Sequence, residues 1–296
     1  MNDKVQLPLF IDKTRLPTGK NHISYSELID WHECSYRHKL KHVDKLYKFD
    51  ASIHTIFGHV LHGALEAYVL TGKTPSVEEC TAEFQAKVGE LLFTDRAKTA
   101  EEAQEFIDAI PDLLEQGPKF LDSEFPGWKL VSAEEQLFEP IDGQTNKYFK
   151  GFIDLVIKTP KKKTANKTRL SGLKGEVVPG EYVYWIIDWK TTSFGWQAKQ
   201  KRSFEKHMQL ILYKHFWCKK HGVDLKDARC GFGFLRRKPM KDGTRVTVLP
   251  ISVGPKAVDK ALKVLHNGLN QIRVGRTLKN RYNCMWCPYK FTDHCP

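Results

Sequence analysis

The sequence contains no long apolar run. No stretch approaches the roughly 20 consecutive apolar residues that a membrane-spanning helix requires. The opening residues, MNDKVQLPLFIDK, also lack the basic start, apolar stretch and small-residue cleavage site of a signal peptide. We therefore expect a cytoplasmic protein that does not enter a membrane.

Acidic residues are scarce compared with basic ones. The 296 residues include 35 Asp and Glu but 47 Lys and Arg, a formal net charge of +12. A positive surface attracts polyanions, and nucleic acid is the obvious partner because neutralising its phosphates releases counterions. A solvated lysine-rich face would account for the same charge equally well, so charge alone does not decide between the two.

The seven cysteines form an odd set in a chain without a secretion signal, which argues against a disulfide framework. Three of them crowd the C-terminus as Cys284-x2-Cys287-x7-Cys295, a spacing typical of a metal site. Another three, Cys80, Cys218 and Cys230, are interpreted as ordinary core or surface thiols.

The spacing of apolar residues changes near residue 125. Helical spacing predicts a helix over 24–46, capped by Ser24, a second over 56–70, and two more that fill 76–122 and end near Gly117-Pro118. Alternation of apolar and polar residues then predicts strands at 130–138, 148–158, 181–190, 228–236 and 244–253. Helical spacing predicts two further helices, at 197–221 and 255–274. We expect an α/β fold: a mainly helical portion over 1–125, a mixed central sheet with flanking helices over 126–275, and a cysteine tail over 276–296.

A charged pair interrupts one of the most apolar predicted strands, YVYWIIDWKTTS. Asp188 and Lys190 are two positions apart and share one face of a strand, whereas Trp189 packs on the other. If the two preceding strands pair as a hairpin, Asp154 comes alongside. Two carboxylates brought together repel, and a divalent cation is the usual remedy. Such a site suits Mg²⁺ or Mn²⁺ and phosphodiester hydrolysis; the structural alternative is a buried ion pair without chemistry.

Four motifs occur in order along the chain: Gly58-x3-His62, Gly151-Phe-Ile-Asp154, Ile187-Asp188-Trp-Lys190 and Gln209-x3-Tyr213. With these motifs the chain resembles the PD-(D/E)XK nuclease superfamily. It is most similar to the RecB-like branch, which includes the nuclease domain of the AddB subunit and the exonucleases of CRISPR adaptation. The resemblance implies a restriction-endonuclease-like core.

The resemblance also implies roles for individual residues. His62, Asp154 and Asp188 would bind Mg²⁺ or Mn²⁺ together with the backbone carbonyl of Trp189, and Lys190 would be the catalytic lysine. Two further residues, Gln209 and Tyr213, are four apart on one helix and would point toward the active site. Glu135, in AEEQLF, fits the acidic residue that such nucleases often carry ahead of the metal-binding hairpin.

Two residues share the helical stripe of His62 without matching a family position. His59 is interpreted as a surface or supporting histidine. Glu66 either hydrogen-bonds His62 from one turn further on or is solvated.

The same resemblance assigns a 4Fe-4S cluster to the cysteines. Cys34 would complete the set of Cys284, Cys287 and Cys295 and would clamp the N-terminal helix to the C-terminal tail. The last spacing is x7, whereas the family usually has something nearer x5. Zn²⁺, or His294 as a ligand in place of Cys295, therefore stays open, as does a thiol cluster without metal.

The function implied is a metal-dependent DNA nuclease, and foremost an exonuclease acting on linear or single-stranded DNA in recombination, repair or DNA degradation. The basic segment 161–174 and the aromatics Phe194 and Trp196 are candidates for gripping phosphates and stacking bases, although the aromatics suit a core equally well. No Walker A sequence is present, so a helicase or other recombination partner would be a separate protein. The alternatives are a non-catalytic nucleic-acid-binding module that retains the fold and a zinc-stabilised assembly factor.

Overall fold

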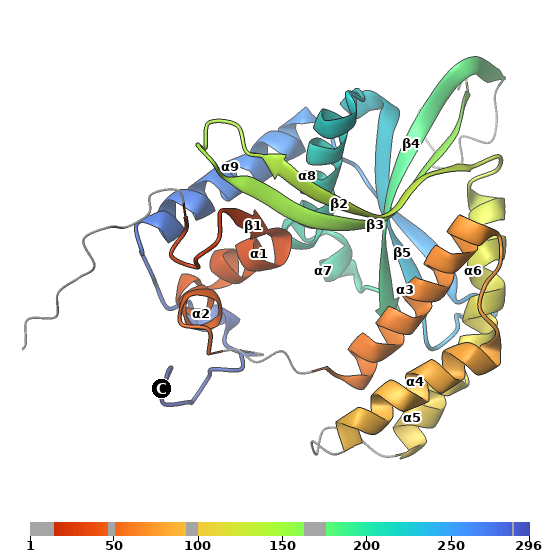
Figure 1. Cartoon of the computed structure of the whole chain (residues 1–296), viewed down its shortest axis with the longest axis horizontal. Helices are drawn as coiled ribbons and strands as arrows, with labels where there is room; N and C mark the ends of the chain where they lie inside the picture. Colours follow the sequence, from red (N-terminus) through yellow and green to blue (C-terminus); the bar gives the residue numbers. More distant parts are fainter. Residues whose placement is uncertain (1–14, 47–50, 93–99, 163–175, 286) are drawn as a thin grey trace, which may run out of the picture. The chain divides into compact units, whose positions relative to one another are not determined.

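The computed structural model describes residues 15–46, 51–92, 100–162, 176–285 and 287–296 (Figure 1). These residues belong to two compact units. The first comprises residues 1–48, 138–151 and 262–296, and the second comprises 49–137 and 152–261. Most of the predicted basic segment 161–174 lies outside the described residues.

A mixed sheet of six strands forms the centre of the described chain, in the order β1-β3-β4-β5-β6, with β2 also paired to β3. Antiparallel pairs join β3 to β4 and β5 to β6, whereas β1 runs parallel to β3 and β4 runs parallel to β5. The strands are β1 (His22–Ser24), β2 (Lys129–Pro140), β3 (Tyr148–Lys162), β4 (Val177–Thr192), β5 (Ala228–Arg236) and β6 (Val246–Ile251). The predicted α/β class with a mixed central sheet is confirmed.

Six α-helices of the described residues lie in the second unit (Figure 1). They are α3 (Ile53–Thr71), α4 (Val77–Leu92), α5 (Ala100–Ile107), α6 (Ile110–Glu124), α7 (Ala198–Lys201) and α8 (Phe204–His221). The helix predicted over 197–221 is divided at Ser203, whose hydroxyl accepts a hydrogen bond from the backbone N–H of Lys206 at 3.3 Å and thereby starts α8.

The helical segment was predicted to end near Gly117-Pro118. Helix α6 instead continues to Glu124, with Pro118 inside the helix. Proline removes one backbone hydrogen bond and usually ends a helix. Burial compensates here, because Leu121 and Phe125, beyond the proline, are only 0% and 2% exposed. Gly117 allows the close packing of α6 on α3, since a Cβ at this position would lie 2.5 Å from the Leu65 side chain.

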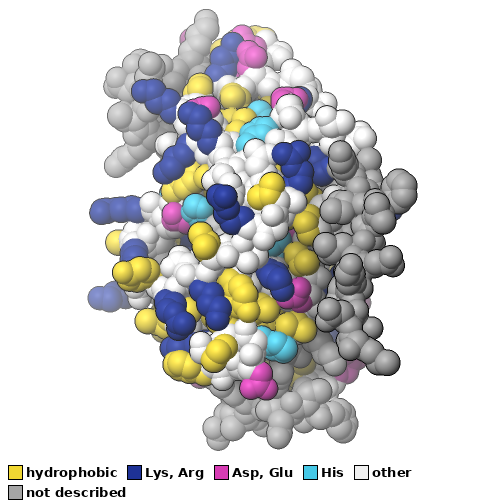
Figure 2. Space-filling view, turned by 90° about the vertical axis from the view of Figure 1, so that its left-hand side faces the viewer, with side chains coloured by type: hydrophobic (Ala, Val, Ile, Leu, Met, Phe, Trp, Pro, Cys, Tyr) yellow, Lys and Arg dark blue, Asp and Glu magenta, His cyan; other side chains and the backbone are white. Residues whose placement is uncertain are grey.

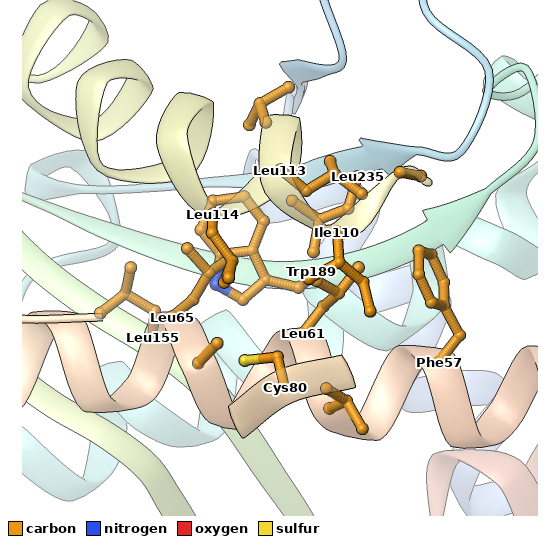
Figure 3. Packing of buried hydrophobic residues seen from close by; sticks show 14 of the residues in the cluster. Phe57, Leu61, Leu65, Cys80, Ile110, Leu113, Leu114, Leu155, Trp189 and Leu235 are labelled. Carbon is orange, nitrogen blue, oxygen red and sulfur yellow. The ribbon is translucent and has the colours of Figure 1, made fainter. Parts of the chain in front are cut away.

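The main core of the second unit lies between α3, α6 and one face of the sheet (Figure 3). Trp189 of β4 projects into this core and is 3% exposed. The neighbouring strand accommodates the indole ring because it carries Gly233, where a Cβ would lie 2.2 Å from the ring. The alternation of β4 therefore places Val183, Trp185, Ile187 and Trp189 on this face and leaves Asp188 and Lys190 on the opposite face.

In the first unit, the prediction of one continuous helix over 24–46 is wrong. The predicted Ser24 cap is present, with the hydroxyl accepting from Glu27 N–H at 3.2 Å. Helix α1 (Tyr25–Glu33), however, ends at Cys34, which is extended at φ −162° and ψ 104°. The Cys34 sulfur accepts from Arg37 N–H at 3.5 Å and starts the short helix α2 (Ser35–His38). A side chain that caps the next helix competes with helix continuation, and this explains the break.

Helix α2 leads into a π-helical turn over Lys39–Val43, and the long helix α9 (Pro255–Arg273) leads into the C-terminal tail. The tail contains a 3₁₀ turn over Arg281–Asn283 and a bridge between Thr292 and Cys295. Among the described residues, no helix combines the length and the hydropathy needed to cross a bilayer.

Candidate active site

Asp188 and Lys190 form an ion pair on the face of β4 opposite Trp189. The Lys190 Nζ lies 2.5 Å from Asp188 Oδ2, and Asp188 is 2% exposed. Burial raises the pKa of Asp188, and the lysine offsets this only in part. Burial lowers the pKa of Lys190, but the Asp188 carboxylate outweighs it and the net shift is upward. Lys190 is therefore a cation at neutral pH.

Helix α8 holds the other oxygen of Asp188. Gln209 donates from Nε2 to Asp188 Oδ1 at 2.7 Å, and the same amide nitrogen lies 3.3 Å from the Tyr213 hydroxyl. Burial raises the pKa of Tyr213, so its hydroxyl stays protonated. The predicted helix face of Gln209 and Tyr213 thus contacts the predicted strand pair.

Asp154 comes from the neighbouring strand of the predicted hairpin. Strands β3 and β4 are antiparallel, and their last backbone pair before the site joins Leu155 and Ile187. Asp154 directly precedes Leu155 on β3, and its Oδ2 accepts a hydrogen bond from the backbone N–H of Trp189 at 2.6 Å. At this position of β4 a side-chain carboxylate, rather than a backbone carbonyl of β3, accepts the hydrogen bond. Burial, and then the charge of Asp188, raise the pKa of Asp154 well above its ordinary value. The structure brings the two carboxylates together.

His62 of α3 faces the same carboxylate, with Nδ1 3.7 Å from Asp154 Oδ2. Gly58, one turn earlier, lets α3 approach β4, because a Cβ there would lie 3.1 Å from Thr191 Oγ1. Burial, and then the charge of Lys190, lower the pKa of His62 to about 4. The imidazole is therefore neutral near pH 7, the form that binds metal ions.

Glu135, the acidic residue predicted on β2, is engaged elsewhere. Its carboxylate accepts from Trp217 Nε1 at 3.0 Å, from Lys220 Nζ at 2.7 Å and from Ser132 Oγ at 2.5 Å, and it lies 2.7 Å from His221 Nε2. Burial alone would raise the pKa of Glu135, but these hydrogen bonds lower it to about 2. The structure does not bring Glu135 to the two aspartates.

Its neighbour Glu134 lies closer to the site, and sequence reasoning missed it. Glu134 adopts φ +46°, the left-handed region that a residue other than glycine seldom occupies. Burial, then the charges of Glu66 and Asp188, raise its pKa. A backbone irregularity of this kind changes which face a strand residue occupies, and nothing in the local sequence AEEQLF signals it.

The donor set suits a hard divalent cation. Two carboxylates, an imidazole and a backbone carbonyl are ligands that Mg²⁺ or Mn²⁺ accept. Asp188 Oδ2 is buried and lies 2.5 Å from the Lys190 ammonium, so a divalent cation would share this oxygen with the lysine. As the described side chains stand, however, no three of His, Cys, Asp or Glu are grouped around one metal position. The Lys190 ammonium lies beside Asp188 in this arrangement.

The four predicted cluster cysteines line one cavity of about 370 Å³ in the first unit: Cys34, Cys284, Cys287 and Cys295. Hydrogen bonds fasten the two chain segments to each other. The side chains of Asn280 and Asn283 both donate to Glu33 O at 2.9 Å, and Asn280 N–H donates to the Cys34 sulfur at 3.4 Å. The cavity fits a thiolate-bound group, although no three ligands among the described residues are closed around a metal position.

The other three cysteines, Cys80, Cys218 and Cys230, are buried thiols. Burial raises the pKa of Cys80 and Cys218 to about 11 and that of Cys230 to about 12. Thiols held in the protonated form are poor nucleophiles and poor ligands, which agrees with their interpretation as ordinary core residues.

Comparisons with known proteins agree with this geometry. The family model of the PD-(D/E)XK nuclease superfamily matches residues 22–171 and 177–295. No curated protein matches the sequence significantly. Among solved structures, a Eubacterium rectale protein described as a putative exonuclease aligns with a TM-score of 0.53 at 12% identity, over 97% of this chain and 94% of that one. At this identity the likeness supports the fold alone.

Proposed function

Because the chain belongs to the PD-(D/E)XK nuclease superfamily, we propose that it is a metal-dependent DNA nuclease, and specifically an exonuclease acting on linear or single-stranded DNA. The observation that carries the proposal is a pair of carboxylates on neighbouring strands beside Lys190: Asp188 is buried, and the side chain of Asp154 is 15% exposed. Burying such charges costs several kcal/mol per ion unless a cation compensates. A divalent cation bound by the two carboxylates would offset this cost beyond what Lys190 already does.

In the proposed site, His62, Asp154, Asp188 and the carbonyl of Trp189 hold Mg²⁺ or Mn²⁺. When bound, the cation supplies positive charge where negative charge builds up on the phosphate. Lys190, whose pKa is raised, keeps its proton and donates a hydrogen bond that orients the attacking water or a phosphate oxygen.

Gln209 is a positioning residue in this proposal. By donating to Asp188 Oδ1, it fixes the carboxylate so that Oδ2 stays directed toward Lys190 and the cation. Tyr213, next to the same amide, limits the rotation of the Gln209 side chain.

The charge of the molecule supports DNA as the substrate. Lys and Arg side chains are numerous and acidic ones few on the face drawn in Figure 2, in line with the formal net charge of +12. Exonuclease action is the form of the proposal that matches the description of the Eubacterium rectale protein with this fold. A helicase or another recombination protein is the partner that we propose for such a nuclease.

The proposal is tested with end-labelled DNA in Mg²⁺ or Mn²⁺. Asp188→Ala and Lys190→Ala should each lower hydrolysis at least a hundredfold without unfolding the protein. Asp224 and Lys226 make a matched control, since they are also two positions apart and 2.8 Å from each other but are exposed. Asp224→Ala and Lys226→Ala should keep full activity. Wild-type protein that leaves single- and double-stranded DNA intact would contradict the proposal, as would an active Asp188→Ala variant. Substrates labelled at the 5′ or 3′ end, together with closed circles, report polarity and any endonuclease action.

For the cysteine cavity we propose a structural 4Fe-4S cluster bound by Cys34, Cys284, Cys287 and Cys295. Iron and acid-labile sulfide analysis of protein purified without oxygen should give about four of each per chain. Zinc alone would assign the cavity to Zn²⁺, and no metal would leave a thiol cluster. Cys34→Ser should lower the iron content, whereas Cys80→Ser, at a buried position outside the cavity, should not.

A further inference from the structure

The loop after β4 is anchored on the face of the sheet that carries Lys190. Trp196 packs against Phe232 and Phe234 of β5, with ring centroids 4.7 and 5.3 Å apart. Phe234 is the register partner of Lys190, and the Lys190 Nζ lies 5.9 Å from the centre of the Phe232 ring. Paired residues of neighbouring strands project to the same side of a sheet. Trp196 is thus a supporting residue that fixes this loop beside the proposed catalytic lysine.

Phe194, two residues before Trp196, has no such support and is 72% exposed. The backbone around it is nevertheless held firmly. Gly195 takes φ +83° and donates its N–H to Thr192 Oγ1 at 3.1 Å, and the buried Arg236 donates from Nε to the Phe194 carbonyl at 3.3 Å. A Cβ at Gly195 would lie 2.7 Å from the Arg236 guanidinium. A fixed backbone therefore presents a large apolar ring to solvent.

Cations lie over both aromatic rings of this loop. The Lys238 Nζ lies 5.6 Å from the centre of the Phe194 ring, and the Lys206 Nζ lies 5.4 Å from the Trp196 ring. Further exposed cations follow the loop in α7 and directly after it: Lys199, Lys201 and Arg202. Aromatic rings interleaved with cations are typical of surfaces that bind single-stranded nucleic acid, because bases stack on the rings and phosphates contact the cations.

We propose that Phe194 is a stacking platform for an unpaired base of the DNA substrate, with Lys238 and Lys206 contacting the flanking phosphates. This inference rests on the proposed nuclease function and extends it to the substrate class: the strand that reaches Lys190 is single, because a base inside a duplex already has both faces stacked on its neighbours. An isolated exposed apolar residue is ordinary. Phe194 differs from one such as Leu70, which is 58% exposed, by its aromatic ring, by the Lys238 ammonium over that ring and by its position next to the catalytic strand.

The test compares Phe194→Ala, Phe194→Trp and the control Leu70→Ala on a single-stranded oligonucleotide. Phe194→Ala removes the binding free energy of one base stacked on an aromatic side chain, so we expect KM to rise about tenfold. The Kd measured by fluorescence anisotropy without divalent cation should rise by the same factor. The value of kcat should stay within about twofold. Phe194→Trp should restore KM, Leu70→Ala should match wild type, and thermal melting should show that all variants fold.

A second substrate separates stacking from a general loss of binding. On an oligonucleotide with abasic sites near the cleaved end, wild type should bind about as weakly as Phe194→Ala, and the substitution should cause no further loss. Equal KM and Kd for wild type and Phe194→Ala on the base-containing strand would overturn the inference while leaving an active nuclease intact. If wild type hydrolyses nothing, the nuclease proposal fails, and the anisotropy measurement still decides the role of Phe194.

Discussion

Removing the charge of Lys190 alone should destabilise the protein, whereas removing the charges of Asp188 and Lys190 together should not. The perturbations are Lys190→Met and the double variant Asp188→Asn/Lys190→Met, both measured with divalent cations chelated. The first variant leaves the buried carboxylate of Asp188, and that of Asp154 on the neighbouring strand, without the ammonium that lies 2.5 Å from Asp188 Oδ2. The second replaces the pair by uncharged side chains of similar volume.

The exposed fractions of the Asp188 and Lys190 side chains determine how much each variant should change the free energy of unfolding. Breaking a fully buried ion pair costs about 3–5 kcal/mol. The Asp188 side chain is 3% exposed but that of Lys190 is 33% exposed, so solvent screens part of the effect and we expect about 2–3 kcal/mol for Lys190→Met. In the double variant, the side-chain carbonyl of the introduced asparagine still accepts the hydrogen bond that Gln209 donates to Asp188 at 2.7 Å. Replacing a buried ion pair by uncharged groups is often neutral or stabilising by about 1–4 kcal/mol, so the stability of the double variant should equal or exceed that of wild type.

Urea denaturation followed by circular dichroism measures both variants. Lys190→Met should unfold at a lower urea concentration with an unchanged slope, the double variant should unfold at or above the wild-type midpoint, and both should lack nuclease activity. The exposed pair Asp224 and Lys226 has the same spacing, and its corresponding variants should leave the midpoint unchanged. If the urea midpoint of Lys190→Met equals that of wild type, or if the double variant is less stable than Lys190→Met, then the buried charge of Asp188 does not lower the free energy of unfolding when Lys190 is absent, and the reasoning is refuted.

Two further predictions concern residues around the site. Glu135→Gln should lower the free energy of unfolding by about 1–2 kcal/mol at neutral pH, since it removes a charged acceptor of several hydrogen bonds. Because the pKa of Glu135 is lowered from 4.5 to about 2 in the folded state, its contribution is present above pH 4.5 and lost as pH falls toward 2; urea midpoints against pH should converge there. Hydrolysis should survive Glu135→Gln, and its loss in a stable protein would restore Glu135 as a catalytic residue. Gly58→Ala should reduce hydrolysis more than stability, because alanine favours a helix but its Cβ, 3.1 Å from Thr191 Oγ1, displaces α3 and His62. Adding Thr191→Ala should restore activity, and a fully active Gly58→Ala would show that this approach is not limiting.

Local patterns accounted for most of the architecture. The period-2 alternation at 148–158 and 181–190 predicted the strands of the central hairpin, and helical spacing predicted the helix that carries Gln209. These predictions succeed because each depends on which residues share a face of one element. The longer strands observed, β3 to Lys162 and β4 from Val177, extend the same pattern.

The predictions that failed depend on contacts between distant residues. Local spacing predicted a helix through Cys34, but its sulfur accepts backbone hydrogen bonds from Arg37 and from Asn280, far along the chain, and the helix breaks there. The helical segment over 76–122 was expected to end near Gly117-Pro118, yet packing of the following turn against the core carries α6 on to Glu124. At Pro118, tertiary packing exceeds the local preference against proline inside a helix, which is worth about 3 kcal/mol.

By itself, the sequence determined that this chain is an α/β protein with Asp188 and Lys190 on one strand face, because side-chain alternation and helical periodicity are local properties of the backbone. Tertiary structure alone decided how the acidic residues of β2 are used: Glu135 is bound to α8, whereas the left-handed backbone of Glu134 exposes that residue to the charge of Asp188. Tertiary structure also decided that Trp196 supports the sheet while Phe194, two residues away, is exposed. Burial and hydrogen bonding to residues distant in sequence set these outcomes, and a one-dimensional pattern does not contain them.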